Sequence, residues 1–330
     1  MKGVLLINLG SPDSPSVKDV RKYLSQFLND PYVIAINPVA RFFLVNCIIV
    51  PFRAKKSAKL YEQIWTKEGS PLINHGMKVK ELLQKELGSD YAVEFGMRYQ
   101  SPGIETALQS LKKKNVSEIV AIPLYPQYAT SSTKSSIEKV KRIIWKSNYP
   151  PVRFIEKFYD DENYIEALVD VAGKYDLGKY DHFIFSYHGL PERQITKESG
   201  FCKLSDECCS SINDKNKFCY RAGCFETTRQ LAQRLNIPKE KYSLSFQSRL
   251  DDKWLKPYSD KVVVEKAKQG IKKILVFSPA FVADCLETIY EIGKEYHLLF
   301  QHHGGEEITL VESLNENPKW ISALKNIVLK

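Results

Sequence analysis

The chain of 330 residues lacks any apolar segment long enough to cross a membrane. Its longest apolar stretch, Phe42 to Phe52, is interrupted by Asn46 and Pro51 and falls well short of the ~20 residues that a transmembrane helix needs. The apolar run at 4–9 is too short for a secretory signal and ends in turn residues. We therefore expect a cytoplasmic protein.

Signals for nucleic-acid binding are absent as well, because the sequence contains neither a zinc finger nor an RNP motif. The formal charge is nonetheless +9, from 48 Lys and Arg against 39 Asp and Glu. Such a balance can attract anionic lipid or a carboxylated small molecule, and it fits equally well a solvated lysine-rich surface. Hydrophobic residues make up 43% of the chain and charged residues 26%, which is typical of a folded globular protein.

Short apolar runs alternate with longer helical patterns along the whole chain. We expect eight strands, at 4–9, 92–97, 118–125, 152–158, 182–188, 242–248, 273–279 and 307–313. Apolar strands separated by helices are typical of parallel sheets that are covered on both faces. Two groups of four strands predict an α/β fold with two similar Rossmann-like domains, 1–160 and 161–330, each with a four-stranded parallel sheet flanked by helices. Residues 117–142 and 272–295 share one pattern, which fits either a duplication or two units that obey the same packing rules.

Ligands of such folds bind beyond the carboxyl ends of the strands. Those ends fall at 8–11, 98–99, 125–128, 188, 247–249 and 279–284. Neither G-x-G-x-x-G nor G-x-x-x-x-G-K-[ST] occurs at any of them, which argues against a dinucleotide or a P-loop nucleotide.

Three places carry side chains suited to chemistry. His188 ends a strand in SYHGLPER, where an imidazole can take a proton or bind a divalent metal ion, although a histidine there is often structural. Asp284, Glu287 and Glu291 are spaced to share one face of a helix, with Leu286, Ile289 and Ile292 opposite. That stripe fits a path for protons or a hard cation, and it fits a solvated face as well. Trp254 follows a strand and could form an aromatic wall for a flat ligand or cap a small core.

Several motifs, in this order, resemble those of the ferrochelatases: LLINLGSPDS, GMRYQSP, LYPQYATSSTKSS, SYHGLPER, FQSR with WLKP, SPAFVADCLETIYEI and SLNENP. The resemblance covers nearly the whole chain. It implies the chelatase fold, with porphyrin bound in a cleft between two similar α/β domains. It also implies an enzyme that inserts Fe²⁺ into protoporphyrin IX to make protohaem, the last step of haem biosynthesis.

The resemblance assigns roles by position. His188 matches the essential histidine, a proton acceptor or metal ligand, and Glu287 matches the glutamate paired with it across the porphyrin. Asp284 and Glu291 match an acidic path that leads away from that glutamate. The expected substrate-binding residues are Arg98, Tyr99, Trp254, Leu9, Tyr128 and Ser70.

Five of the seven cysteines crowd into the expected insert 196–224: Cys202, Cys208, Cys209, Cys219 and Cys224. Disulfides are rare in cytoplasmic proteins, and closely spaced thiols suit a metal site with zinc or an iron–sulfur cluster. Some ferrochelatases carry a [2Fe–2S] cluster, so the resemblance favours that cofactor over zinc or free thiols. Four ligands are needed and five are present. Cys47 and Cys285 are interpreted as packing residues.

The segment 31–53 is the most apolar part of the chain and lies outside the strand pattern. Arg41 and Arg53 bracket its apolar run, and Lys55, Lys56 and Lys59 follow it. A combination of this kind suits shallow insertion into an anionic bilayer surface, while an ordinary buried helix is the alternative. The segment resembles the apolar lip of membrane-associated ferrochelatases, which implies peripheral membrane binding and protoporphyrin as substrate.

Three other functions remain open at this point. One is a related chelatase for coproporphyrin, for another tetrapyrrole or for another metal such as cobalt. Another is a non-catalytic haem or porphyrin carrier, which would not need His188 or the acidic stripe. The third is a redox sensor built on the cysteines, which would leave the strand-end motifs unexplained. A homodimer is compatible with the sequence, and the last helix is expected to pack back on the first domain.

Overall fold

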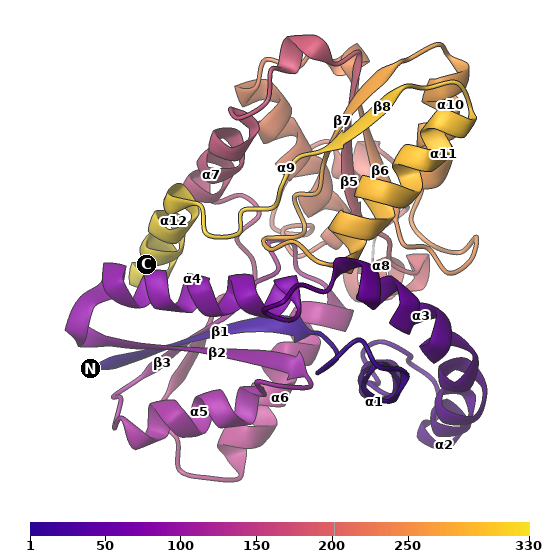
Figure 1. Ribbon diagram of the computed structural model, residues 1–330. Helices are drawn as coiled ribbons and strands as arrows, with labels where there is room; N and C mark the ends of the chain where they lie inside the picture. Colours follow the sequence, from indigo (N-terminus) through magenta and orange to yellow (C-terminus); the bar gives the residue numbers. More distant parts are fainter. Residues whose placement is uncertain (201) are drawn as a thin grey trace. The chain divides into compact units, whose positions relative to one another are not determined.

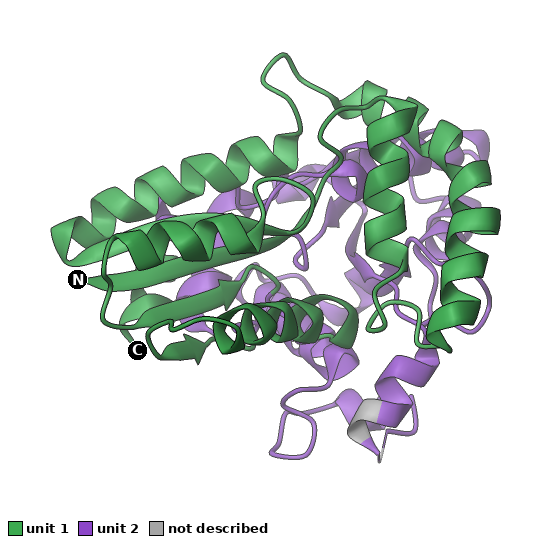
Figure 2. Cartoon of the chain, turned by 90° about the horizontal axis from the view of Figure 1, so that it is seen from below, with its two compact units in different colours: residues 1–125, 129–156, 324–330 green, residues 126–128, 157–323 purple. Residues whose placement is uncertain are grey.

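The computed structural model describes residues 1–200 and 202–330. Phe201 lies outside the described residues, as do the side chains of Glu198 and Ser199, all within the expected insert 196–224. The chain divides into two compact units (Figure 2). Unit 1 comprises residues 1–125, 129–156 and 324–330, and unit 2 comprises residues 126–128 and 157–323.

Each unit is built on a four-stranded parallel sheet (Figure 1). The strands of unit 1 are β1 (Lys2–Gly10), β2 (Tyr91–Tyr99), β3 (Ile119–Pro123) and β4 (Val152–Phe154), in the order β2-β1-β3-β4. Those of unit 2 are β5 (His182–His188), β6 (Tyr242–Gln247), β7 (Lys273–Phe277) and β8 (Glu307–Leu310), in the order β6-β5-β7-β8. The eight strands match the eight apolar runs, and the predicted fold class is confirmed.

Helices cover both faces of the sheet in unit 1 (Figure 1). The faces are covered by α4 (Pro71–Leu87) on one side and by α5 (Ile104–Lys113) and α6 (Ser135–Trp145) on the other. The other helices of the unit are α1 (Val17–Leu28), α2 (Pro38–Phe43), η1 (Leu44–Ile49), α3 (Val50–Ile64), η2 (Gly88–Asp90) and η3 (Thr130–Lys134). Alternate strand residues point to opposite faces, so Leu5 and Ile7 pack in one cluster with Leu108 of α5 and Val140 of α6. On the other face, Gly76 lets α4 approach Phe95 closely, because a Cβ there would lie 2.2 Å from the ring.

Unit 2 repeats this layering with the elements α7 (Glu162–Ala172), η4 (Leu177–Lys179), α8 (Glu192–Ser199), η5 (Glu207–Cys209), α9 (Tyr220–Arg234), η6 (Lys239–Lys241), α10 (Ser259–Lys268), η7 (Leu286–Tyr296) and α11 (His297–His302). Ile184 and Ile274 of the sheet pack with Val263 of α10 and Ile292 of η7. The last helix, α12 (Pro318–Leu329), begins in unit 2 and ends in unit 1. Its fully buried Trp320 packs against Phe158, with 5.7 Å between ring centroids.

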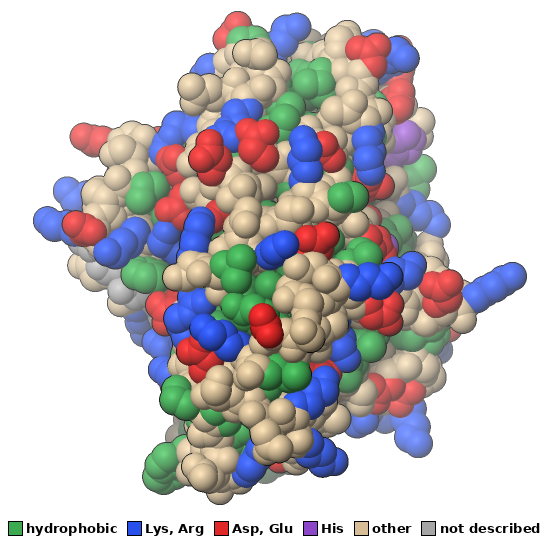
Figure 3. Space-filling view, turned by 90° about the vertical axis from the view of Figure 1, so that its left-hand side faces the viewer, with side chains coloured by type: hydrophobic (Ala, Val, Ile, Leu, Met, Phe, Trp, Pro, Cys, Tyr) green, Lys and Arg blue, Asp and Glu red, His purple; other side chains and the backbone are tan. Residues whose placement is uncertain are grey.

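The surface carries charges of both signs. On the face in Figure 3, basic and acidic side chains alternate over short distances, so no single-sign patch dominates that face. Within residues 1–200 and 202–330, no helix combines the length and the apolar character that spanning a bilayer requires.

Candidate active site

His188 stands at the carboxyl end of β5, one of the two inner strands of unit 2. Its Nδ1 lies 2.6 Å from the carbonyl oxygen of Gly189. Because a carbonyl can only accept a hydrogen bond, Nδ1 carries the proton and Nε2 keeps its lone pair in the neutral ring. The ring is half-buried, and the rings of Trp254 and Phe281 lie 6.4 Å from it, centroid to centroid. His188 is therefore oriented as a proton acceptor or metal ligand through Nε2.

The acidic stripe is arranged differently from the expectation. The carboxylates do not share an α-helix, since η7 is a π-helix that begins at Leu286, after Asp284. A π-helix has more residues per turn than an α-helix, so Glu287 and Glu291, four apart, lie near one face. Ile289, expected to pack on the sheet, is exposed, while Ile292 is buried.

Asp284 is engaged in holding its own loop. Its Oδ1 accepts hydrogen bonds from Thr288 Oγ1 at 3.1 Å and Ser313 N at 3.2 Å. Its Oδ2 accepts from Asn315 Nδ2 at 2.8 Å. Asp284 thus ties the start of η7 to the loop after β8, and its expected place in an acidic path stays a prediction.

Glu287 occupies the first turn of η7 and is half-buried. Burial raises the pKa of the adjacent Cys285 thiol well above its usual range, and the nearby Glu287 carboxylate adds to that rise. Cys285 is therefore a neutral packing residue near neutral pH, as expected. The thiol and the carboxylate lie side by side at the start of the helix.

Glu291 is held by four uncharged donors. Its Oε1 accepts from Ser248 N and Tyr296 OH, each at 2.8 Å. Its Oε2 accepts from Ser248 Oγ and from Gln247 Nε2, the latter at 3.3 Å. Gln247 ends β6 beside His188, so one rim of the sheet in unit 2 carries the imidazole and the anchor of the acidic helix. The strand-end rule pointed to 247–249 but not to this contact.

In unit 1, Arg98 and Tyr99 end β2 and converge on a carboxylate that the sequence did not single out. Asp30 Oδ2 accepts from Arg98 Nη2, from Tyr99 OH at 2.8 Å and from Ser135 Oγ at 2.6 Å. Arg98 Nε also donates to Ser135 Oγ at 2.7 Å. Burial raises the pKa of Tyr99 well above its usual range, so the phenol stays protonated. Asp30 follows α1 rather than a strand, which is why the strand-end rule missed it.

The remaining expected substrate contacts come from three separate segments. Leu9, the last residue but one of β1, is half-buried, and Ser70 is buried at the N-cap of α4. The ring of Tyr128 packs on Phe218 with 5.6 Å between centroids. Their role stays a prediction.

Buried polar atoms without partners also gather where the strands of unit 1 end. The hydroxyls of Ser11 and Thr130 and the amide of Gln100 have no hydrogen-bond partner in the described part of the chain. These residues follow β1, β3 and β2 respectively. Since buried polar groups are normally satisfied, a polar ligand or water is the natural partner at this edge.

The five clustered cysteines belong to unit 2 and gather around Cys219. Burial raises the pKa of the Cys219 thiol, and the neighbouring Cys202 and Cys208 add to the rise. Burial also raises the pKa of Cys209 to about 11, although Arg221 Nη1, 3.1 Å from its sulfur, opposes the shift. Soft thiols in such proximity have the donor chemistry of an iron–sulfur or zinc site. Yet no group of three or more His, Cys, Asp or Glu side chains in residues 1–200 and 202–330 is already placed to hold a metal ion.

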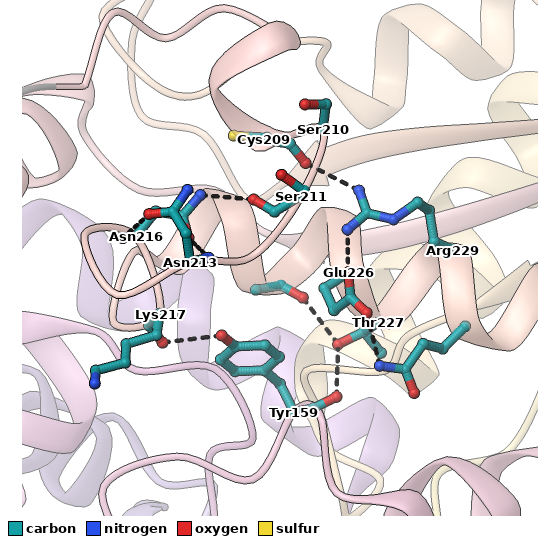
Figure 4. A network of polar contacts seen from close by, with 12 residues as sticks. Tyr159, Cys209, Ser210, Ser211, Asn213, Asn216, Lys217, Glu226, Thr227 and Arg229 are labelled. Carbon is teal, nitrogen blue, oxygen red and sulfur yellow. Dashed lines mark hydrogen bonds and ion pairs between the residues drawn. The ribbon is translucent and has the colours of Figure 1, made fainter.

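The segment that carries the thiols is fastened to α9 and to the strand of His188. Arg229 on α9 donates to the Cys209 carbonyl at 3.0 Å and pairs with Glu226 (Figure 4). Tyr159 OH donates to the Lys217 carbonyl at 2.9 Å in the same view. Tyr220, next to Cys219, donates to the carbonyl of His188 at 2.7 Å.

Comparison with known proteins gives consistent matches. The family model described as Ferrochelatase matches residues 1–330. The ferrochelatase of Coxiella burnetii (strain CbuK_Q154) is 44% identical and covers 99% of this chain and 93% of its own length. The ferrochelatase of Legionella pneumophila (strain Paris) is 42% identical, with coverages of 99% and 98%.

Solved structures give a match in fold. SirB from Bacillus subtilis with Fe³⁺ has a TM-score of 0.54 at 14% identity and covers 100% of this chain and 95% of that one. The cobalt complex of the sirohydrochlorin chelatase SirB from Bacillus subtilis subspecies spizizenii also has a TM-score of 0.54, at 13% identity, with coverages of 99% and 93%. At these identities the similarity is one of fold alone.

Proposed function

This chain belongs to the ferrochelatase family and is an enzyme that inserts iron into a porphyrin, and we propose that His188 and Glu287 carry that reaction on protoporphyrin IX. The observation that carries the proposal is the orientation of His188. Its Nδ1–H donates a hydrogen bond to the Gly189 carbonyl, which leaves the lone pair of Nε2 as the acceptor. Removal of porphyrin N–H protons requires such an acceptor, and Gln247 links the strand end of His188 to the helix that carries Glu287.

The reaction must remove two N–H protons and replace the water around Fe²⁺. His188 Nε2 takes the first proton, and the half-buried Glu287 takes the second or contacts the incoming metal ion. The rings of Trp254 and Phe281 flank the imidazole, so a flat macrocycle can stack beside the base. Rigid aromatic walls can also favour a puckered ring whose nitrogens are exposed to the metal. In unit 1, Asp30 and Ser135 hold Arg98 at the end of β2, where we expect it to bind the substrate by hydrogen bonds.

The test is anaerobic incubation of the protein with protoporphyrin IX and Fe²⁺, followed by absorbance. The wild type should form haem. His188→Ala and Glu287→Gln should lose metallation while fluorescence quenching still shows porphyrin binding. A carrier would bind the porphyrin and form no haem, and near-normal turnover by either variant would falsify the assignment of that residue.

We also propose that four of the five thiols hold a [2Fe–2S] cluster that supports the fold. The support is their convergence around Cys219 and the attachment of their segment to α9 and to the strand of His188. When bound, the cluster would contribute to the folding free energy, since a metal site that forms only in the folded chain stabilises that chain.

Visible absorption together with iron and sulfide analysis of the purified protein tests the cluster. Cys219→Ser should give colourless, poorly soluble protein, whereas Cys47→Ser, which removes an exposed thiol on η1, should keep the colour. Stoichiometric zinc without sulfide in the wild type would contradict this proposal.

Peripheral binding to an anionic membrane is the third part of the proposal, and it rests on the segment 31–53. Val39, Phe42, Phe43, Ile48 and Phe52 are each more than half exposed, and the exposed Arg53, Lys55, Lys56 and Lys59 follow. Arg41 does not join this basic cluster. It is buried, and its Nη1 donates to the carbonyls of Ile34 and Ile36 at 3.1 and 3.2 Å. Cys47 is exposed rather than packed.

Co-sedimentation with anionic vesicles tests this surface. The wild type should pellet with the vesicles, and a triple variant, Phe42→Ser, Phe43→Ser, Ile48→Ser, should stay in the supernatant. Trp145→Ser is the matched control, because Trp145 is 89% exposed on α6, outside the segment. A wild type that stays in the supernatant and turns over coproporphyrin faster than protoporphyrin would contradict both the membrane and the substrate proposals.

A further inference from the structure

Gln247 links β5, which ends in His188, to η7, which carries Glu287 and Glu291, although it belongs to neither element. It is the last residue of β6, and its side chain is 1% exposed. Its backbone pairs with His188, and its carbonyl accepts the Gly189 N–H at 2.7 Å. Its main chain is therefore fixed against the strand end that presents His188.

The side chain of Gln247 reaches the acidic helix. Nε2 donates to the backbone carbonyl of Glu287 at 2.9 Å and to Glu291 Oε2 at 3.3 Å. The two hydrogens of one amide thus hold two successive turns of η7. Ser248 adds two further bonds to Glu291 from the next position.

A chain of buried serines fixes which way the amide faces. Ser186 Oγ donates to Gln247 Oε1 at 2.7 Å, so its single hydrogen is used. Ser259 must then donate to Ser186 at 2.9 Å, and Ser245 to Ser259 at 2.8 Å. All three serines are at most 1% exposed, so water does not compete. The amide oxygen is held toward the serines, and the NH₂ group is held toward η7.

We infer that Gln247 is a positioning residue, which sets the distance between His188 and the carboxylates of η7 and acts through Glu287 and Glu291. The inference rests on the proposed roles of His188 and Glu287. A displacement of about 1 Å between reacting groups can cost on the order of 10²-fold in rate, so loss of this link should lower turnover without removing any reacting group.

Two variants test the inference. Gln247→Met keeps the length of the side chain and removes both donors and the acceptor. Ser186→Ala leaves Gln247 in place and removes the bond that fixes the amide, together with the bond from Ser259, so it serves if Gln247→Met does not fold. The matched control is Gln269→Leu, because Gln269 also donates to a glutamate, Glu265, at 2.9 Å, but on the exposed end of α10.

Turnover should be measured per porphyrin-binding site, which corrects for unfolded protein. We expect kcat to fall about 10- to 100-fold in Gln247→Met and by less in Ser186→Ala, with the KM for porphyrin within about twofold of the wild type. A double variant with Glu291→Gln should lose less than the product of the two single effects, because both changes release the same helix. Gln269→Leu should behave as the wild type.

The outcomes separate this inference from the proposed function. A wild type without haem formation would overturn the function itself. An active wild type with an inactive Glu287→Gln variant, but with normal kcat in Gln247→Met and Ser186→Ala, would overturn only the positioning role. Strictly multiplicative effects of Gln247→Met and Glu291→Gln would also overturn it, since they would show that the two residues act independently.

Discussion

The two units have the same backbone geometry at the carboxyl ends of their sheets but carry different side chains there. In each unit an inner strand meets a glycine at its carboxyl end: β1 ends with Leu9–Gly10, and Gly189 follows His188, the last residue of β5. A Cβ on either glycine would lie too close to the carbonyl oxygen of the neighbouring strand end, that of Tyr99 at 2.2 Å or of Gln247 at 2.8 Å.

The neighbouring strand ends also correspond. Tyr99 and Gln247 are each followed by a residue in the left-handed region, Gln100 with φ of 62° and Ser248 with φ of 60°. Each side chain donates to a carboxylate, Tyr99 to Asp30 and Gln247 to Glu291. In both units a π-helix follows the third strand, η3 with hydroxyls and a lysine and η7 with acids.

The comparison shows that two sheets of the same topology carry different side chains at their strand ends. It also favours duplication over mere agreement in packing, because left-handed residues and close glycine approaches recur at matching positions. The carboxylate of unit 1 is neutralised by Arg98, whereas that of unit 2 is held by uncharged donors. We therefore expect unit 1 to contribute binding and unit 2 to contribute the reaction.

The largest expected difference separates the two corresponding residues before the glycines. His188→Ala should lower kcat by at least about 10²-fold, since it removes the proposed proton acceptor. Leu9→Ala should change kcat by less than about 10-fold and act mainly on the KM for porphyrin, because it removes only apolar contact. Steady-state kinetics on both variants measure the split. Equal losses of kcat in the two variants would contradict the expectation that unit 1 contributes binding and unit 2 contributes the reaction.

The two held carboxylates should differ in their effect on stability. Asp30→Asn leaves the largely buried Arg98 without its charged partner and should cost about 3–5 kcal/mol of unfolding free energy. Glu291→Gln replaces an acceptor that faces only uncharged donors and should cost about 1–2 kcal/mol. Urea unfolding of both variants gives the comparison. A smaller loss for Asp30→Asn than for Glu291→Gln would show that the ion pair does not anchor unit 1.

The two glycines should also respond unequally. Gly10 has a φ of 129° in addition to the close carbonyl, so Gly10→Ala should cost about 3 kcal/mol. Gly189 has no positive φ, and Gly189→Ala should cost about 1 kcal/mol. Thermal unfolding compares the pair. A larger loss of unfolding free energy in Gly189→Ala than in Gly10→Ala would show that the strand end of unit 2 has less room for a Cβ than that of unit 1.

The smallest difference concerns the starts of β1 and β5. The first residue of β5 to pair with β7 is His182, where β1 has Gly3. Burial lowers the pKa of His182 from 6.5 to about 4. Between pH 6.5 and pH 4 the unfolded chain therefore binds a proton at His182 that the folded chain does not bind. The stability from this group is full above pH 6.5 and falls as the pH drops toward 4.

Between pH 7 and pH 5 this loss should amount to about 2 kcal/mol. His182→Asn, which can still bond to Ser243, should flatten that part of the profile, as urea unfolding at several pH values would show. An unchanged slope in the variant would mean that other groups titrate there.

Much of this protein could be predicted from short patterns. Eight apolar runs gave eight strands because buried parallel strands must be apolar on both faces. The strand-end rule located His188, Arg98 and Gln247 for the same topological reason. The three acids were expected to share one helix, but Asp284 precedes η7, because the spacing of the acids does not show where the helix begins.

By itself, the amino-acid sequence determined the fold class and the residues at the strand ends, because both follow from the local pattern of apolar residues. It also determined the family, because the family is recognised by short motifs. Only the tertiary structure decided what those residues contact. Asp30 meets Arg98 from a distance of 68 positions in the chain, and Gln247 meets Glu291 from 44. Hydrogen bonds between such distant positions depend on how the helices pack on the sheet, and no local pattern encodes that geometry.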